Sequence, residues 1–120
     1  MGEYKFQSLI VYQLAINYFD KLYDLVTELP PSERYNLSSQ IIRAATSIAL
    51  NIAEGSTGQS DKEQGRFLGL ALRSYIETVA CLDLCKRRSY LDDINTNHLQ
   101  NLGRQLFIKI IKFKNALQES

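Results

Sequence analysis

The sequence predicts an all-α protein, a single antiparallel up-down-up-down four-helix bundle over residues 1–120. Three observations predict this fold. Glycine and proline are scarce, with six Gly and two adjacent Pro, which favours long helices over many short strands. Apolar residues recur at intervals of three and four, as on one face of an α-helix. Four such segments are joined by short polar connections, which place consecutive helices antiparallel.

The first helix is expected from about Ser8 to Glu28, and it is apolar on two sides. This is more apolar surface than one core needs, which indicates burial on two sides, as in an oligomer. Pro30 and Pro31 end the helix, because proline lacks the backbone N–H and restricts the residue before it. The two apolar stripes are Leu9, Tyr12, Ile16, Phe19, Tyr23 and Val26, and Val11, Leu14, Tyr18, Leu22, Leu25 and Leu29.

The second helix is expected from about Leu37 to Glu54, after a short turn at Ser32–Asn36. Ser32 or Ser38 is a candidate cap, and Gly55 ends the helix. Several alanines on its apolar side let neighbouring backbones approach closely. That side consists of Ile41, Ile42, Ala45, Ile48, Ala49, Ile52 and Ala53.

The third helix begins after a polar loop over residues 56–59. Ser60 and Glu63 have the spacing of a capping box, and the helix is expected to run from there to about Arg88. Residues 89–91 connect it to the fourth helix, which runs to about Gln118. The candidate caps of the fourth helix are Asp92 and Asp93.

A polar stripe with helical spacing lies beside the apolar side of the second helix. The third helix offers complements, and a pair between Arg43 and Glu77 across the two helices is expected. In one interpretation the stripe is a ligand or RNA groove, with Arg43 as the anion contact. In the other it is a hydrogen-bonded network that fixes helix register, and breaking buried charges in it would cost several kcal/mol. The stripe consists of Gln40, Arg43, Ser47, Asn51 and Glu54, with Arg66, Arg73, Ser74 and Glu77 facing it.

No recognisable set of catalytic residues is present. His98 is the only histidine and lies among polar residues, which favours a surface position. There is no nucleophile elbow, no glycine-rich phosphate loop and no Glu-x-x-His pair. Cys81 and Cys85 are four apart, which is not zinc-ligand spacing, and are expected to be small buried thiols. The sequence therefore predicts no enzyme activity, no cofactor and no metal.

The net charge is +1, but the charges are unevenly distributed. Residues 1–85 hold seven Lys/Arg and ten Asp/Glu, whereas residues 86–120 hold seven and three. The basic part is either a solvated surface with cations near helix ends or a nucleic-acid contact surface. Its candidate contacts are Lys86, Arg87, Arg88, Arg104, Lys109, Lys112 and Lys114. With neither a signal peptide nor a transmembrane run in sight, we expect a cytoplasmic protein of bacterial type without a membrane partner.

Residues 29–77 resemble a known bacterial family, the 23S rRNA intervening-sequence proteins. That family typically shows Pro-x-x-Glu-x-x-x-Leu-x-x-Gln-x-x-Arg-Ala, which stands here at residues 30–44. A second motif, Ser-Ile-x-x-Asn-Ile-Ala-Glu-Gly, stands at residues 47–55, and Phe67-Leu68, Ala71, Ser74 and Glu77 match its third helix. Two positions depart from the family pattern. Ala49 replaces a frequent proline, which implies a smaller kink, and Arg73 replaces a frequent glycine, which implies an altered helix crossing or an opening.

The resemblance implies a homopentameric ring of bundles and a connection with ribosomal RNA. A more distant similarity is to the accessory variability proteins of diversity-generating retroelements, which are more basic and bind a reverse transcriptase. The leading hypothesis is therefore a non-enzymatic homo-oligomer associated with RNA. One alternative is a scaffold that binds another protein, such as a reverse transcriptase-type partner. The other is a small-molecule site at the polar stripe.

Overall fold

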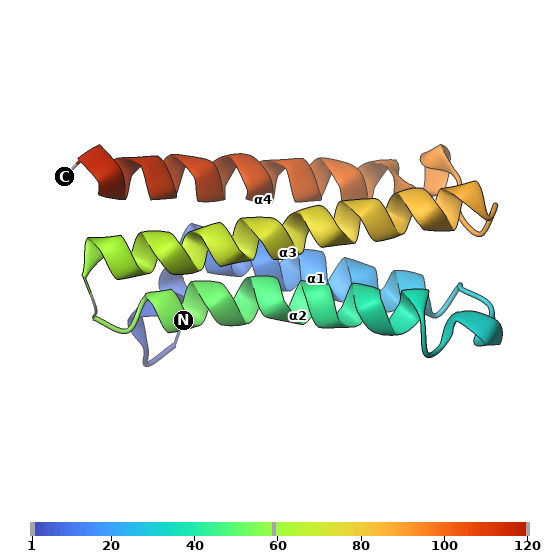
Figure 1. Cartoon of the computed structure of the whole chain (residues 1–120), viewed down its shortest axis with the longest axis horizontal. Helices are drawn as coiled ribbons and strands as arrows, with labels where there is room; N and C mark the ends of the chain where they lie inside the picture. Colours follow the sequence, from blue (N-terminus) through green and yellow to red (C-terminus); the bar gives the residue numbers. More distant parts are fainter. Residues whose placement is uncertain (1, 59, 120) are drawn as a thin grey trace.

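Four long helices dominate the part of the chain that the structure, a computed structural model, describes, namely residues 2–58 and 60–119. Figure 1 shows that successive helices run in alternate directions, which confirms the predicted antiparallel bundle. Each helix packs against two others: α1 and α3 both contact α2 and α4. The elements are η1 (Lys5–Ser8), α1 (Ile10–Val26), η2 (Pro31–Glu33), α2 (Leu37–Gly55), α3 (Asp61–Arg87) and α4 (Asp93–Glu119).

Helix α1 is shorter than the apolar pattern predicts. Residues Lys5–Ser8 form the 3-10 helix η1, and Leu9 has an extended backbone before α1 begins. The side chain of Gln13 holds η1 against α1, since its Nε2 donates to the carbonyl of Gln7 at 2.6 Å. At the other end α1 stops at Val26, ahead of the two prolines. The apolar spacing extends beyond both ends of α1, because it indicates which residues are buried and does not indicate their backbone conformation.

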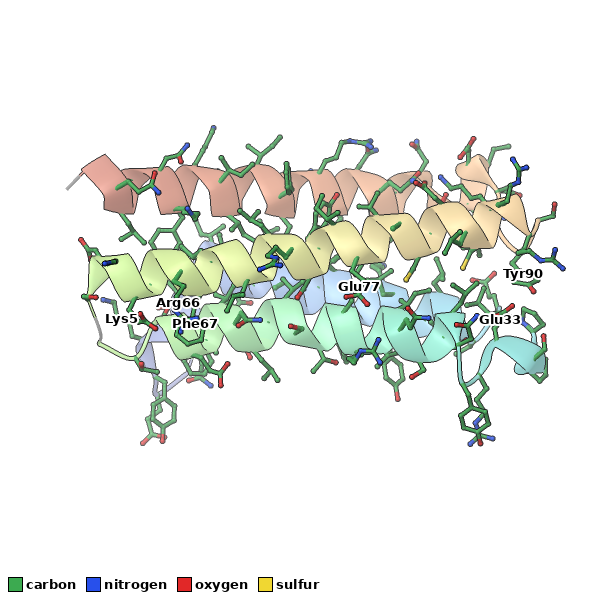
Figure 2. All side chains as sticks on the ribbon, viewed as in Figure 1. Lys5, Glu33, Arg66, Phe67, Glu77 and Tyr90 are labelled. Carbon is green, nitrogen blue, oxygen red and sulfur yellow. The ribbon has the colours of Figure 1, made fainter. Side chains whose placement is uncertain are left out.

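The start of α2 is not capped by either predicted serine. Asn36 occupies the N-cap position without a side-chain cap bond. Instead, the carboxylate of Glu33 accepts from Asn36 Nδ2 at 3.1 Å and lies 3.5 Å from the N–H of Leu37. Its other oxygen accepts from the hydroxyl of Tyr90 at 2.9 Å, which joins the α3–α4 connection to η2 (Figure 2). The Tyr90 bond is the main reason that the pKa of Glu33 lies below its ordinary value.

The starts of α3 and α4 follow the sequence prediction closely. Ser60 Oγ accepts from the N–H of Glu63 at 3.1 Å, as the first half of a capping box requires. The carboxylate of Glu63 does not complete the box, because it pairs with Arg66 at 2.6 Å. Asp92 is the cap of α4, and its Oδ1 accepts from the N–H of Asn95 at 2.8 Å. Gln59, in the predicted loop between α2 and α3, lies outside the described residues.

The two apolar stripes of α1 have different environments. Tyr18 and Leu22 belong to the stripe that is buried in the core except at the half-buried Leu14, whereas Tyr12, Phe19 and Tyr23 of the other stripe are half-buried or exposed. The second apolar side of α1 that the sequence predicts is therefore partly exposed to solvent on a single chain. The fully buried large side chains of the core include Tyr18, Leu22, Ile41, Ile48, Ile52, Leu68, Leu82, Leu106 and Ile110.

A hydroxyl pair lies in the middle of this core. Thr78 donates to the carbonyl of Tyr75 at 2.6 Å, so the hydroxyl of Tyr18 donates to Thr78 Oγ1, 2.8 Å away. Gly103 of α4 leaves room for the rings. A Cβ added there would lie 3.0 Å from Cε1 of Tyr18 and 3.1 Å from Cε1 of Tyr75. The arrangement satisfies buried hydroxyls and at the same time sets how closely α4 approaches α1 and α3.

Both cysteines are buried and free, as predicted. Burial raises the pKa of Cys85 to about 11 and also raises that of Cys81.

Because the folded thiols stay protonated while unfolded thiols ionise near pH 9, the free energy of unfolding should be constant up to about pH 9 and fall as the pH rises further. Urea titrations between pH 7 and 10 measure this. A Cys81→Ala/Cys85→Ala double variant should show a shallower decline, and an equal slope in both proteins would contradict the prediction.

Candidate functional site

The predicted polar stripe lies along the contact between α2 and α3, and we call it the polar seam. The structure brings three of its side chains together around Ser47. Ser74 Oγ donates to Ser47 Oγ at 2.9 Å. Asn51 Nδ2 donates to the same hydroxyl at 3.0 Å and to the carbonyl of Ser47 at 2.8 Å. Ser47 therefore joins the two helices through a small network of neutral groups.

The predicted ion pair across the two helices is present. Arg43 Nη2 lies 3.7 Å from Glu77 Oε2, and Figure 2 shows Glu77 on the side of α3 that faces α2. The two side chains are 67% and 44% exposed, so water solvates both charges. The expected penalty of several kcal/mol for breaking this network is therefore wrong, because it assumed buried charges.

The remaining seam residues do not converge on a site. Gln40 Nε2 donates to Asn36 at 2.8 Å, along its own helix. Glu54 and Arg73 are exposed, and within the described residues their side chains have no hydrogen-bonding or ionic partner. Arg73, expected to alter the helix crossing or to line an opening, is exposed to solvent. Arg66 pairs with Glu63 and not with the seam. These four side chains therefore add no group to the Ser47 network or to the Arg43–Glu77 pair.

Replacing Glu77 by glutamine should lower the free energy of unfolding by about 0.2–1 kcal/mol, the usual value of an exposed ion pair. Chemical denaturation at low and high salt measures the effect. The difference between the variant and the parent should shrink at high salt, because exposed charges are screened. A loss of several kcal/mol would show that the pair is desolvated in solution, contrary to the structure.

The predicted nucleic-acid contacts form two groups and not one patch. Lys86 is held by Asp93, with Nζ 2.9 Å from Oδ1, while Arg87 and Arg88 are exposed at the end of α3. Lys114 lies 21 residues beyond the first residue of α4, which is about 30 Å along a helix. The exposed cations of the second group are Arg104, Lys109 and Lys112, and the half-buried Lys114 lies against Gly69 of α3.

A hollow that the sequence pattern did not predict lies between the end of α1 and the start of α2. Its volume is about 750 Å³. Two sequence signals pointed to it, namely Arg43, the one seam residue in its lining, and the partly exposed apolar stripe of α1 that contains Tyr23. Its lining includes Tyr23, Pro30, Pro31, Arg34, Ile42 and Arg43.

On the part of the chain that the structure describes, no three His, Cys, Asp or Glu side chains gather to hold a metal ion. His98 is exposed on α4, as predicted. Among the same residues, no helix combines the length and apolarity needed to cross a bilayer.

Residues 7–112 match the sequence profile of the family described as 23S rRNA-intervening sequence protein. The chain belongs to this family. A crystal structure of a protein of unknown function from the S23 ribosomal protein family of Bacteroides thetaiotaomicron has the same fold, with a TM-score of 0.80 and 24% identity. The similarity covers 88% of this chain and 98% of that one. No curated protein of known function matches significantly.

The motif residues that this 23S rRNA-intervening sequence protein shares with its family have structural roles in the bundle. Glu33 accepts from Tyr90 and Asn36 ahead of α2, and Ser47 and Asn51 form the centre of the seam. Gly55 lies so close to α3 that an added Cβ would be 2.7 Å from Cβ of Phe67. These four motif residues therefore determine how α2 packs between its neighbours.

Proposed function

We propose that this member of the family is a non-enzymatic, self-assembling bundle of the cytosol that associates with RNA. The observation that carries the proposal is the outer side of α4. Arg104, Ile108 and Lys112 follow one another at intervals of four, all exposed, and no carboxylate among the described side chains pairs with either cation. Cations on one helix face that have no carboxylate partner suit the evenly spaced phosphates of a nucleic acid. The name of the family points to the same class of partner.

Self-assembly is supported by apolar side chains that one chain leaves in contact with water. Every long helix exposes at least one large apolar residue to about half or more of its area. A ring needs two different faces on each subunit, and exposure on all four helices provides them. Five subunits follow from the family resemblance. The residues concerned are Ile10, Tyr23, Leu50, Ile76, Leu84, Ile94 and Ile108.

Size-exclusion chromatography with light scattering tests assembly and nucleic acid together. The untagged protein, purified at low salt, should elute at a mass near five chains, with excess absorbance at 260 nm that salt removes. A five-chain peak free of nucleic acid would support assembly and count against the RNA association. A monomer would overturn the assembly.

The contribution of α4 is tested by the salt dependence of RNA binding. For a single-stranded RNA, the double variant Arg104→Ala/Lys112→Ala should reduce the slope of log affinity against log salt by about 1.4, since each lost phosphate contact contributes about 0.7. A matched control removes Lys86 and Arg73, of which the first is held by Asp93. An equal reduction in both variants would argue against a specific role for α4.

A protein-interaction scaffold is the second candidate, and it is favoured by the apolar exposure alone. If Leu84, which is 54% exposed on α3, is still accessible in the assembled protein, a partner protein is the better explanation of that surface. Chemical labelling of a Leu84→Cys variant distinguishes the two cases. Protection in the oligomer indicates self-assembly, and free labelling indicates a site for a different protein.

A further inference from the structure

The hollow between α1 and α2, which we call the Arg34–Arg43 groove, has the size of a ligand site. Its volume of about 750 Å³ lies within the range of about 300–1,000 Å³ that is usual for small-molecule pockets. One wall is the end of α1 with Tyr23, and the opposite wall is the first turns of α2 with Ile42. Pro30 and Pro31 close the end, and their rings fix the backbone there.

The charge of the groove is positive in an otherwise acidic part of the chain. Arg34 and Arg43 are the charged residues of its lining, and no carboxylate belongs to it. By contrast, residues 1–85 as a whole hold ten acidic and seven basic side chains. Arg43 meets the carboxylate of Glu77 at 3.7 Å, but the Arg43 side chain remains 67% exposed. The groove therefore favours an anion, and two guanidinium groups suit the oxygen atoms of a phosphate.

The apolar part of the groove contains an accessible aromatic ring. Tyr23 is 53% exposed, and Arg34 of the lining has its guanidinium 5.3 Å from the ring centroid of Tyr35, which is 85% exposed. Exposed aromatic rings interleaved with arginines are the surface on which unpaired nucleobases stack. An aliphatic anion would use the charge but gain little from the rings.

We infer that the Arg34–Arg43 groove binds a nucleoside phosphate, with the phosphate at the two arginines and the base against Tyr23 and the prolines. The choice of a nucleotide rests on the RNA association proposed above. The same chemistry has two sources, a free nucleotide or one unit of a single-stranded RNA. In the second case the groove reads a base while α4 contacts the backbone.

Two probes separate these sources, namely uridine 5′-monophosphate measured by calorimetry at low salt and a fluorescein-labelled ten-nucleotide uridine RNA measured by anisotropy. The variant Arg34→Ala/Arg43→Ala should weaken binding of the monophosphate at least tenfold. Arg104→Ala/Lys112→Ala makes the same change of charge on α4 and should leave monophosphate binding within twofold. Glu77→Gln breaks the ion pair of Arg43 but keeps its guanidinium, so it should also retain binding. Because all these side chains are exposed, circular dichroism should show folded variants.

The stacking part is tested at Tyr23. Replacing it by leucine keeps an apolar side chain but removes the ring, and should weaken binding of both probes at least about fivefold, since base stacking on an aromatic side chain contributes about 1 kcal/mol or more. Tyr4→Leu is the matched control, because Tyr4 is 61% exposed outside the groove.

Loss of both probes in the Arg34/Arg43 variant supports the groove as a site for a unit of RNA. Loss of the monophosphate alone, with RNA binding unchanged, supports a site for free nucleotides. If the variant binds the monophosphate as the parent does, or the parent does not bind it at all, the groove inference is overturned. RNA binding by the parent would then still support the proposed function. A parent that binds the monophosphate but not RNA overturns the proposed function and keeps the groove.

Discussion

Replacing Gly103 by alanine should lower the free energy of unfolding by about 1–2 kcal/mol, although alanine is the better helix former. In the middle of a helix, the change from glycine to alanine by itself stabilises by about 1 kcal/mol. At Gly103 the new methyl group would lie 3.0 Å from Tyr18 and 3.1 Å from Tyr75, both held in the core. Overpacking of this kind costs about 1–3 kcal/mol, and rigid rings on both sides place it at the upper end.

Gly65 provides the matched control on α3. It also lies within a helix, but an added Cβ would meet no atom within 4 Å. Gly65→Ala should therefore raise the free energy of unfolding by about 0.5–1 kcal/mol. Urea denaturation of the two variants and the parent measures the difference. If both changes shift stability in the same direction, Gly103 is not the close contact described for α4.

Thr78→Val should destabilise the bundle by about 1–3 kcal/mol, because it leaves the buried hydroxyl of Tyr18 without an acceptor. Valine has nearly the shape of threonine, so packing changes little. Tyr18→Phe should cost less, about 1 kcal/mol, since Thr78 keeps its bond to the carbonyl of Tyr75. Burial also raises the pKa of Tyr18 far above its ordinary value, which agrees with a hydroxyl that has no access to water.

The double variant Tyr18→Phe/Thr78→Val closes a thermodynamic cycle. With both hydroxyls absent, no buried group lacks a partner, so the double variant should be more stable than Thr78→Val alone. The coupling free energy from four denaturation curves measures the bond. A coupling near zero would mean that water or another group satisfies Tyr18 when Thr78 is replaced.

Much of the fold follows from local chemistry that the sequence contains. The two prolines end α1, and Ser60 and Asp92 begin α3 and α4, because each acts through its own backbone or through the next turn of the helix. The ion pair between Arg43 and Glu77 was also predictable, since helical spacing placed both at the contact of consecutive antiparallel helices. The family motif added the identity of the fold, and its residues Glu33, Ser47 and Gly55 have roles in packing.

Other features depend on which helices cover which faces. Helical spacing places the polar seam on one side of α2, but only the packing of α3 decides that Arg43 and Glu77 remain exposed while Ser47 joins the helices. In the sequence, Gly103 looks like a residue that weakens its helix. The structure shows why a glycine is needed there, because Tyr18 of α1 and Tyr75 of α3 leave no room for a larger side chain.

By itself, the sequence determined the number, order and approximate ends of the helices, because these depend on residues within a few positions of one another. The tertiary structure alone decided the Arg34–Arg43 groove and the exposure of the seam charges. The physical reason is that the exposure of a side chain and the shape of a surface hollow depend on how two helices pack against each other. They are set by how closely side chains far apart in the chain pack together, which periodicity within one helix does not specify.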